Sequence, residues 1–236
     1  MASFADNTIP ADFSGTVRLF PLPNLVLFPH VIQPLHVFEA RYCDLLEEAI
    51  AGDGLIAMVL LETGWQHDYE GRPAIAPVAC LGQVISHERV KGRRHNILLR
   101  GVRRAAIRRE HPAVKSFRQA DVDLLDDFYP TSTSVQRPAM QRRLVELATA
   151  LLPTGAGGQD SLAELLSGEV SLGMLTDIFA HTLGFPLDVK QRLLTEWNVD
   201  RRAAILSDRL AQLAKRVPYP LDAAGPPAYP PRFSLN

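Results

Sequence analysis

His36, Glu39 and Cys43 are the residues whose types and spacing come closest to a reactive group. His36 and Glu39 are three positions apart near the start of a predicted helix, where an imidazole and a carboxylate could exchange a proton or hold a metal ion. Cys43 follows on the same predicted helix. An isolated pair of this kind is most often a capping or surface interaction, and a lone cysteine on an apolar helix face is most often a packing residue. We therefore expect no active site here.

The motifs of common enzymes are absent from the sequence. A phosphate-binding P-loop requires Lys directly after Gly, whereas the four lysines, Lys91, Lys115, Lys190 and Lys215, follow Val or Ala. No Ser has Gly two positions before it, and His87-Glu88 lacks the second His of the zinc-protease motif. Cys43 and Cys80 form no CxxC pair. We predict a protein that is not an enzyme and that uses no cofactor and no metal.

Basic residues are concentrated between Ser86 and Arg118. This stretch contains eleven of them, Arg89, Lys91, Arg93, Arg94, Arg100, Arg103, Arg104, Arg108, Arg109, Lys115 and Arg118, against two acidic residues, Glu88 and Glu110. A basic face of this kind could bind an RNA backbone or an acidic partner. The acidic segment DVDLLDD that follows could instead pair with it across a sheet, and only Phe117 is nearby as a stacking platform. RNA binding is therefore an alternative hypothesis.

Size and composition indicate a globular chain without a membrane span. The 236 residues are 47% hydrophobic and carry a net charge of −1, so nothing in the overall charge favours nucleic acid or membrane. The longest conspicuous apolar run, residues 55–61, is much shorter than the roughly 20 residues of a membrane helix. The N-terminus lacks the basic and apolar regions of a signal peptide. With only two cysteines, the reducing cytoplasm is the expected location.

The first half of the chain reads as strands. Residues 55–61 form a continuous apolar run, and Gly82, Gly92 and Gly101 punctuate two further stretches between residues 77 and 110. Short runs bounded by Gly and Pro indicate hairpins in a compact sheet or barrel. Only residues 38–52 resemble a helix, with an inward face of Leu45, Leu46 and Ile50 and a C-terminal stop at Gly52.

The second half reads as helices. One apolar stripe contains Leu144, Leu147, Ala148 and Leu151, a second Leu172, Leu175 and Phe179, and a third Leu206, Leu210, Leu213 and Val217. Such spacing is typical of a helical bundle. Residues 161–164 have the form of a capping box. The predicted domains are a flexible N-terminus (1–15), a β-rich domain (16–129), a helical subdomain (130–217) and an extended or disordered proline-rich tail (218–236).

Three segments, in order along the chain, resemble one family. LFPLPNLVLFPHVIQPLHVFEARY (residues 19–42) resembles the opening of the Lon protease N-terminal domain. CLGQVISHERVKGRRHNILLRGVRRAAI (80–107) resembles its hairpin, and residues 175–213 resemble its helical subdomain, although Ala203 and Ala204 stand where the family often has bulkier or charged residues. The resemblance extends from about Thr16 to Val217.

The resemblance implies an α+β fold, with a PUA-like β pseudobarrel and one helix followed by a C-terminal helical bundle. Prolines 21, 23, 29 and 34 exclude one long central strand, because proline donates no ladder hydrogen bond. The family's fold would place this stretch as short strand pieces with exposed turns between them. The chain contains no Walker motif and no Ser-Lys protease domain, so we expect recognition without ATP-dependent proteolysis.

The leading hypothesis is a polypeptide-binding or adaptor protein whose partner is an unfolded protein, a protease or a chaperone, with no membrane role. The candidate contact residues are Phe28, Pro29 and His30 at a loop tip, Phe38, Arg41 and Tyr42 at the helix start, and Trp65 in a long polar loop. For Phe28, Phe38 and Tyr42, the favoured alternative is a role as core or staple residues. For the RNA alternative, the candidate basic surface is Arg93, Arg94, Arg103, Arg104 and Arg108.

Overall fold

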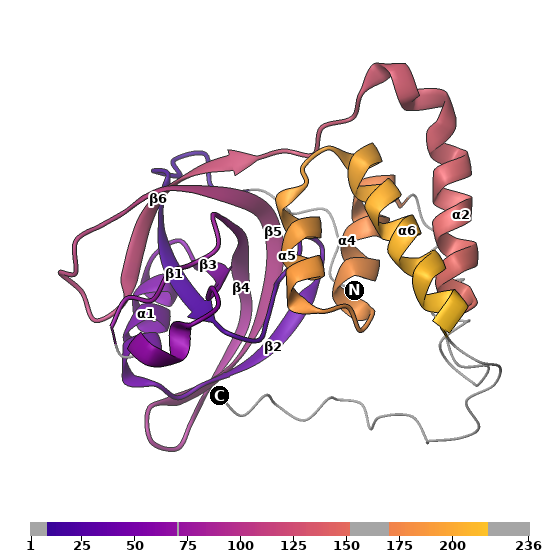
Figure 1. Cartoon of the computed structure of the whole chain (residues 1–236). Coiled ribbons are helices and arrows are strands. Elements are labelled where there is room, and N and C mark those ends of the chain that lie inside the picture. The colour runs from indigo at the N-terminus through magenta and orange to yellow at the C-terminus, as the bar shows by residue number, and fades with distance from the viewer. Residues whose placement is uncertain (1–8, 70, 152–169, 217–236) are drawn as a thin grey trace. The chain divides into compact units, whose positions relative to one another are not determined.

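The computed structural model describes residues 9–69, 71–151 and 170–216. Its contacts divide these residues into two compact units (Figure 1). The first unit comprises the chain up to Asp126 together with Gly184–Thr195, and the second comprises Asp127–Leu183 and the chain from Glu196 onward. The predicted capping box at 161–164 and the proline-rich tail lie outside the described residues. The chain has the predicted α+β class, with one mixed sheet and five described α-helices.

The first unit is a six-stranded sheet with the order β2-β5-β4-β3-β1-β6 and an additional β5–β6 pairing. Its strands are β1 (Thr16–Leu22), β2 (Ile32–Val37), β3 (Leu55–Leu60), β4 (Val78–Val90), β5 (Arg94–Glu110) and β6 (Arg118–Leu125). Because β6 pairs with both β1 and β5, five of the strands form a closed circuit, and β2 extends it as an edge strand on β5. Closure leaves few unpaired backbone groups.

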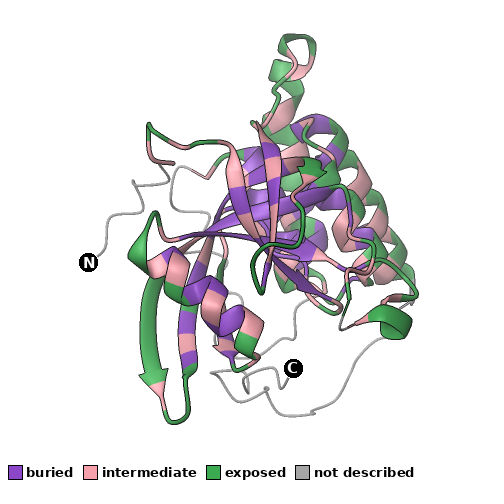
Figure 2. Ribbon diagram, turned by 90° about the vertical axis from the view of Figure 1, so that its left-hand side faces the viewer, coloured by how far each residue is buried: buried purple, intermediate pink, exposed green. Residues whose placement is uncertain are grey.

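Small side chains fill the interior of this closed circuit. Ala57, Ala79, Ala105 and Ala120 are fully buried together with valines and leucines from alternate positions of the same strands. A circuit of few strands has a narrow interior, so alanine fits where larger residues would clash. β3 is buried on both faces, as its continuous apolar run predicts, whereas residues 85–89 of β4 are exposed (Figure 2).

Helix α1 (Ala40–Ala51) packs against β1 and β3 (Figure 1). The predicted helix is confirmed, with Leu45 and Leu46 buried and Gly52 at its C-cap. Helix α5 (Leu187–Thr195) belongs to the first unit and packs against β4. The side-chain amide of Gln191 donates to the Val78 carbonyl over 2.8 Å, and the apolar residues Val189, Leu193 and Leu194 of α5 are buried.

Pro21 and Pro34 are accommodated inside strands because of where those strands pair. β1 pairs with β6 only from Thr16 to Leu19, so Pro21 lies beyond that ladder and contacts β3 on one side. Pro34 lies in the edge strand β2. The expectation of exposed turns between the strand pieces is wrong for residues 26–29, which are buried. They are buried because the chain folds back onto β5, where the His30 N–H donates to the Gly101 carbonyl over 2.9 Å.

The second unit contains the 3₁₀ turn η2 (Thr131–Gln136) and helices α2 (Arg137–Thr149), α4 (Leu172–Thr182) and α6 (Val199–Arg216). The three helices pack on one another through the predicted apolar stripes: Leu144, Leu175 and Leu206 are fully buried. Ser171 caps α4 by accepting a hydrogen bond from the Met174 N–H over 3.1 Å. The domain boundaries proposed from the sequence stay a prediction.

Candidate functional site

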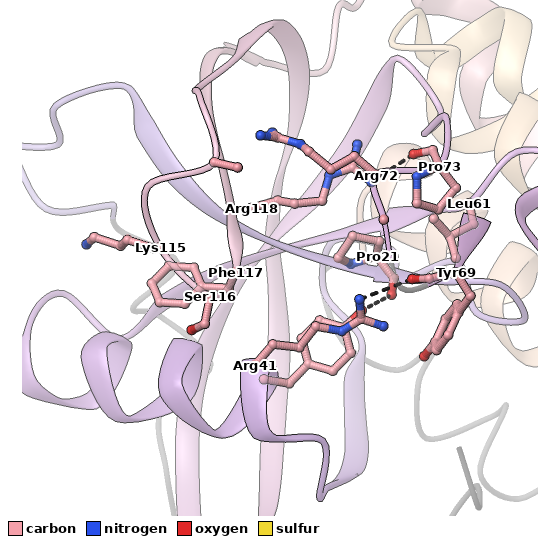
Figure 3. A pocket seen from close by; sticks show the side chains of 13 residues that line it. Pro21, Arg41, Leu61, Tyr69, Arg72, Pro73, Lys115, Ser116, Phe117 and Arg118 are labelled. Atoms are coloured by element: carbon pink, nitrogen blue, oxygen red, sulfur yellow. Dashed lines mark hydrogen bonds between the residues drawn. The ribbon is translucent and has the colours of Figure 1, made fainter.

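A cavity of about 450 Å³ opens in the first unit between the start of α1, the β3–β4 connection and the β5–β6 connection (Figure 3). Rings and cations dominate its lining: Tyr42, Tyr69 and Phe117, with Arg41, Arg72, Lys115 and Arg118. In the view of Figure 3, Lys115 and Phe117 lie on one side and Tyr69 on the other. The 3₁₀ turn η1 (Trp65–Asp68) precedes Tyr69 in the β3–β4 connection.

Arg41 occupies the space between two tyrosine rings. Its guanidinium carbon is 4.9 Å from the Tyr42 ring centre and 4.7 Å from that of Tyr69. Nε and Nη2 both donate to Glu39 Oε2, over 3.1 and 3.0 Å, and Nη1 donates to the Tyr69 carbonyl over 3.2 Å. The Tyr69 hydroxyl donates to Glu39 Oε1 over 2.6 Å. Each group is held by at least two contacts, so this wall is pre-organised.

Burial and the negative charge of Glu39 keep both phenols protonated. The pKa of Tyr69 is raised first by burial and then by its hydrogen bond to Glu39. The pKa of Tyr42 is raised mainly by burial, and its hydroxyl donates to the Pro21 carbonyl over 3.1 Å. The cavity thus presents neutral aromatic surfaces beside charged guanidinium groups.

Glu110 joins two of the arginines from behind the cavity. Arg118 donates Nε to Oε2 over 2.8 Å and Nη2 to Oε1 over 2.6 Å, which is the bidentate geometry favoured by guanidinium and carboxylate. Arg72 donates Nη2 to Glu110 Oε2 over 2.8 Å. Burial alone would raise the pKa of Glu110, but the hydrogen bonds from Arg118 and Arg72 outweigh it, and the pKa is lowered.

Glu110→Gln is expected to make folding less sensitive to acid. A carboxyl group whose folded pKa is depressed stabilises the fold above its unfolded pKa of about 4.3, and this contribution is lost as the pH falls through the folded value. The variant should therefore be less stable than the wild-type protein at neutral pH, and the difference should shrink in acid. Urea unfolding followed by circular dichroism at a series of pH values measures it.

Glu62→Gln serves as the matched control for this experiment. Glu62 is exposed, so removing its charge should leave the stability difference near zero throughout the series. A Glu110→Gln protein that is as stable as the wild type at neutral pH would contradict the proposed role of Glu110.

The β5–β6 connection, which forms one side of the cavity, is bound to α1. The Lys115 ammonium lies 5.4 Å from the centre of the Phe117 ring and pairs with Glu48 on α1. The Ser116 hydroxyl donates to Asp44 over 2.7 Å. Phe117 itself is buried, so it supports the wall while Lys115 faces solvent. These contacts position the β5–β6 connection over the helix.

The structure brings three of the sequence-predicted contact residues to this cavity or to its edge. Arg41 and Tyr42 line it, and Trp65, half-buried, lies edge-on to Tyr69 with ring centres 5.4 Å apart. Phe38 is 39% exposed and lines a separate, smaller pocket that also includes Tyr42. Whether any of these side chains contacts a partner stays a prediction.

The loop tip predicted at residues 28–30 lies elsewhere. The Phe28 side chain is fully buried and Pro29 is also buried, so neither can serve as an exposed contact in this conformation. His30 is half-buried and adopts a positive φ of 67°, which the backbone needs in order to turn into β2. Phe28 and Pro29 therefore belong to the core, where their segment folds back onto β5.

His36 and Glu39 have separate partners. His36 lies in β2, and its Nδ1 is 2.8 Å from Asn96 Oδ1. Glu39 is the N-cap residue of α1 and binds Arg41 and Tyr69. Cys43 is buried, as expected for a packing residue, and burial raises the pKa of its thiol. Among the residues that the structure describes, no three His, Cys, Asp or Glu side chains are grouped closely enough to hold a metal ion.

The predicted basic surface is largely neutralised. β6 pairs with β5, and Arg108 and Arg109 bind Asp123 and Asp121 across the sheet, which confirms the pairing expected from the acidic segment. Arg103 binds Asp126. Arg93 binds Asp44 and Glu47 on α1. Arg94 is exposed in the β4–β5 hairpin.

Arg104 does not belong to a basic surface. Its side chain is buried, with 2% of the residue exposed, and its Nε donates to the Leu194 carbonyl at the end of α5 over 2.8 Å. The positive charge meets the carbonyl end of a helix, where cations are stabilised. Successive side chains of β5 point to opposite faces, so Arg104 meets α5 while its neighbour Arg103 binds Asp126, directly after β6.

Sequence reasoning did not assign the other aromatic and cationic residues of the cavity to a site, namely Tyr69, Arg72, Lys115, Phe117 and Arg118. Tyr69 and Arg72 are in the same long loop as Trp65, so a search for other aromatic and cationic residues in that loop would have found them. No feature of the sequence near Arg118 indicates that it lines a cavity, because its partner Glu110 lies across the β5–β6 turn.

No helix within the described ranges is long and apolar enough to cross a membrane.

The fold is shared with solved Lon N-terminal domains. The N-terminal domain of a Lon protease from the Mycobacterium avium complex matches with a TM-score of 0.63 and 14% identity, covering 83% of this chain and 98% of that one. A Lon N-terminal domain protein from Xanthomonas campestris matches with a TM-score of 0.55 and 20% identity, covering 86% and 99%. The chain is therefore of the Lon N-terminal fold class.

The sequence places the chain within a family. The family model described as the ATP-dependent protease La (LON) substrate-binding domain matches residues 16–212. The chain belongs to this family, and the resemblance inferred from its motifs is confirmed. Related curated proteins include the Lon protease of Cytophaga hutchinsonii, 24% identical over 183 residues, and that of Rhizobium meliloti, 26% identical over 197 residues.

These relatives are much longer than this chain. The match covers 78% of the chain but 22% of the Cytophaga hutchinsonii protein, and 84% of the chain but 24% of the Rhizobium meliloti protein. The shared part is the substrate-binding domain, which supports a role in substrate recognition.

Proposed function

We propose that this chain binds polypeptide segments without cleaving them, as a recognition or adaptor protein, and that the cavity beside α1 is the binding site. Family membership supports a role in recognition. The partners proposed are unfolded proteins, or a protease or chaperone to which such proteins are delivered. Both cysteines are buried and neither is part of a disulfide, which fits the proposed cytoplasmic location.

The observation that carries this proposal is the pre-organised arrangement of Tyr69, Arg41 and Tyr42. Tyrosine and arginine are the residue types that contribute most to protein–protein binding, because they bury a large area and still offer polar groups. Here the Arg41 guanidinium is fixed between two rings and by Glu39 before any partner arrives. A partner would therefore bind with little loss of side-chain entropy.

The finer fold description belongs to the same proposal. The closed circuit of β1, β3, β4, β5 and β6 supports a PUA-like pseudobarrel, and the packing of α2, α4 and α6 supports a helical bundle. A closed circuit is a rigid support for loops, so the two connections that flank the cavity can be held at a fixed separation.

Tyr69→Ala is expected to weaken binding of an unfolded polypeptide by about tenfold, because the variant loses one face of the Arg41 stack and the anchor for Glu39. The probe is fluorescein-labelled α-lactalbumin that has been reduced and blocked with iodoacetamide so that it cannot refold. Fluorescence anisotropy gives the dissociation constant. Circular dichroism checks that the variant remains folded.

Trp197→Ala is the matched control, since Trp197 is an exposed aromatic residue of the second unit, 48% exposed. It should leave binding unchanged. Equal affinity of the Tyr69→Ala and wild-type proteins would refute the cavity as the site, and absence of binding by the wild type would refute polypeptide recognition. A labelled single-stranded RNA tests the alternative: binding that falls steeply with salt and is lost in Arg94→Glu would favour it.

A further inference from the structure

The described lining of the cavity contains four cations and no carboxylate. Arg41, Arg72, Lys115 and Arg118 are all in the lining, whereas their acidic partners Glu39, Glu48 and Glu110 approach from outside it. A concave site lined by one sign of charge concentrates field lines and attracts groups of the opposite sign. The charge of the lining therefore favours anionic over neutral or cationic groups.

The acidic partners do not fully compensate these cations. Glu110 is shared by Arg72 and Arg118, and it binds Arg118 with both oxygens. Glu48 is also shared, by Lys115 and Arg18, although Arg18 has a second carboxylate partner in Asp53. Burial alone would raise the pKa of Glu48, but hydrogen bonds from Lys115 and Arg18 lower it, as for Glu110. Glu110 therefore supplies one negative charge to the two guanidinium groups that it binds, and the carboxylate of Asp68 accepts from the backbone N–H of Arg72 and not from its guanidinium.

Arg72 is the cation best placed to accept a new partner. Its side chain is 33% exposed, and the hydrogen bond that the described residues accept from its side chain is the one from Nη2 to Glu110. Arg118, by contrast, is 11% exposed and donates hydrogen bonds to Glu110 and to the Pro73 carbonyl. A guanidinium group whose other N–H donors can reach a ligand matches a carboxylate in shape and charge.

Aromatic and aliphatic groups lie around these cations. Tyr42, Tyr69 and Phe117 line the same cavity, as do Pro21 and Leu61. An apolar surrounding lowers the local dielectric constant and strengthens an ion pair that is also hydrogen-bonded. It also offers a surface for an apolar side chain next to the charged one.

We infer that the cavity selects polypeptide segments in which an Asp or Glu carboxylate lies beside an aromatic or aliphatic side chain, with Arg72 binding the carboxylate. This inference rests on the proposed function and adds the class of segment that the site prefers. Segments that carry Lys or Arg at the same position are disfavoured by the charge of Arg72 and Lys115.

Three fluorescein-labelled peptides test the inference with the full chain. They share one sequence with Phe and Leu at fixed positions, and they differ at two neighbouring positions that are Glu, Gln or Lys. The Glu peptide should bind about tenfold more tightly than the Gln peptide, and the Lys peptide should bind most weakly. This preference should shrink as salt is added, because exposed charges are screened.

Arg72→Gln is the test variant and Arg89→Gln its matched control. Arg89 is exposed on β4 and is not among the lining residues, so both variants lose one positive charge from the same unit. Arg72→Gln should reduce the preference for the Glu peptide to about twofold, while Arg89→Gln should leave it unchanged. Loss of the preference in both variants would overturn the assignment of Arg72.

The outcomes separate this inference from the proposed function. Equal binding of the Glu and Gln peptides to the wild-type protein would overturn the acidic preference while leaving polypeptide binding in place. No binding of any of the three peptides, with the α-lactalbumin probe also unbound, would overturn both. Tighter binding of the Glu peptide that Arg72→Gln does not alter would place the acidic site elsewhere.

Discussion

Arg202→Ala is expected to lower the free energy of unfolding by about 3–5 kcal/mol, because it removes the cation that is paired with a buried carboxylate. Arg202 on α6 has no exposed side-chain area, and neither has Asp177 on α4. The Arg202 Nε lies 3.4 Å from Asp177 Oδ1, and Nη2 donates to Asp127 Oδ2 over 2.8 Å. The guanidinium thus links two helices and the segment that leads into the second unit.

Arg202 makes further hydrogen bonds within the second unit. Nε donates to the Thr176 hydroxyl over 2.8 Å and Nη1 to the Glu196 carbonyl over 2.9 Å. Removal of this fork would take one hydrogen bond from each of these acceptors, and each loss costs free energy. All three nitrogens of the planar guanidinium donate hydrogen bonds, so Arg202→Lys should restore only part of the lost free energy of unfolding.

Urea unfolding followed by circular dichroism measures this effect. Arg201→Ala is the control, since Arg201 is the exposed neighbour on the same helix and should change stability by less than about 0.5 kcal/mol. If Arg202→Ala were as stable as Arg201→Ala, the network would contribute nothing to folding of the second unit.

The parts of the fold that the sequence predicts well are those with local causes. The continuous apolar run at residues 55–60 predicts a strand that is buried on both faces. The spacing of apolar residues in α1 and the Gly52 stop predict that helix. The acidic segment of β6 could be paired with the arginines of β5 because opposite charges on adjacent strands stabilise one another.

Features with distant causes were not predicted. Helix α5 has only nine residues, and its attachment to the first unit depends on Gln191 meeting Val78 and on the Leu194 carbonyl meeting Arg104. No pattern within residues 187–195 specifies those partners. The same holds for the candidate site. Arg41 and Tyr42 are recognisable at the helix start, but Arg118 reaches the cavity only because β6 closes the sheet beside β1.

Gly101 shows how one residue determines the buried path of the proline-rich segment. A Cβ atom at this position would lie 2.0 Å from the Phe28 carbonyl oxygen and 2.7 Å from its carbonyl carbon. Both are backbone atoms, and two hydrogen bonds hold the residues that follow Phe28 against β5. The Gly101 N–H donates to the Val31 carbonyl over 2.8 Å, and the Gly101 carbonyl accepts from the His30 N–H over 2.9 Å. The segment therefore cannot move aside without breaking these bonds.

Gly101→Ala is accordingly expected to destabilise the first unit by about 1–3 kcal/mol, as overpacking against a fixed wall does. Gly184→Ala is the matched control: Gly184 has nothing within 4 Å of the added Cβ, so this change should be neutral or slightly stabilising. Thermal unfolding of both variants gives the comparison, and hydrogen exchange at the His30 amide reports directly on the contact. Faster exchange in Gly101→Ala alone would show that β5 holds residues 28–30 in the core, whereas unchanged exchange and stability would mean that the contact is looser than its geometry implies.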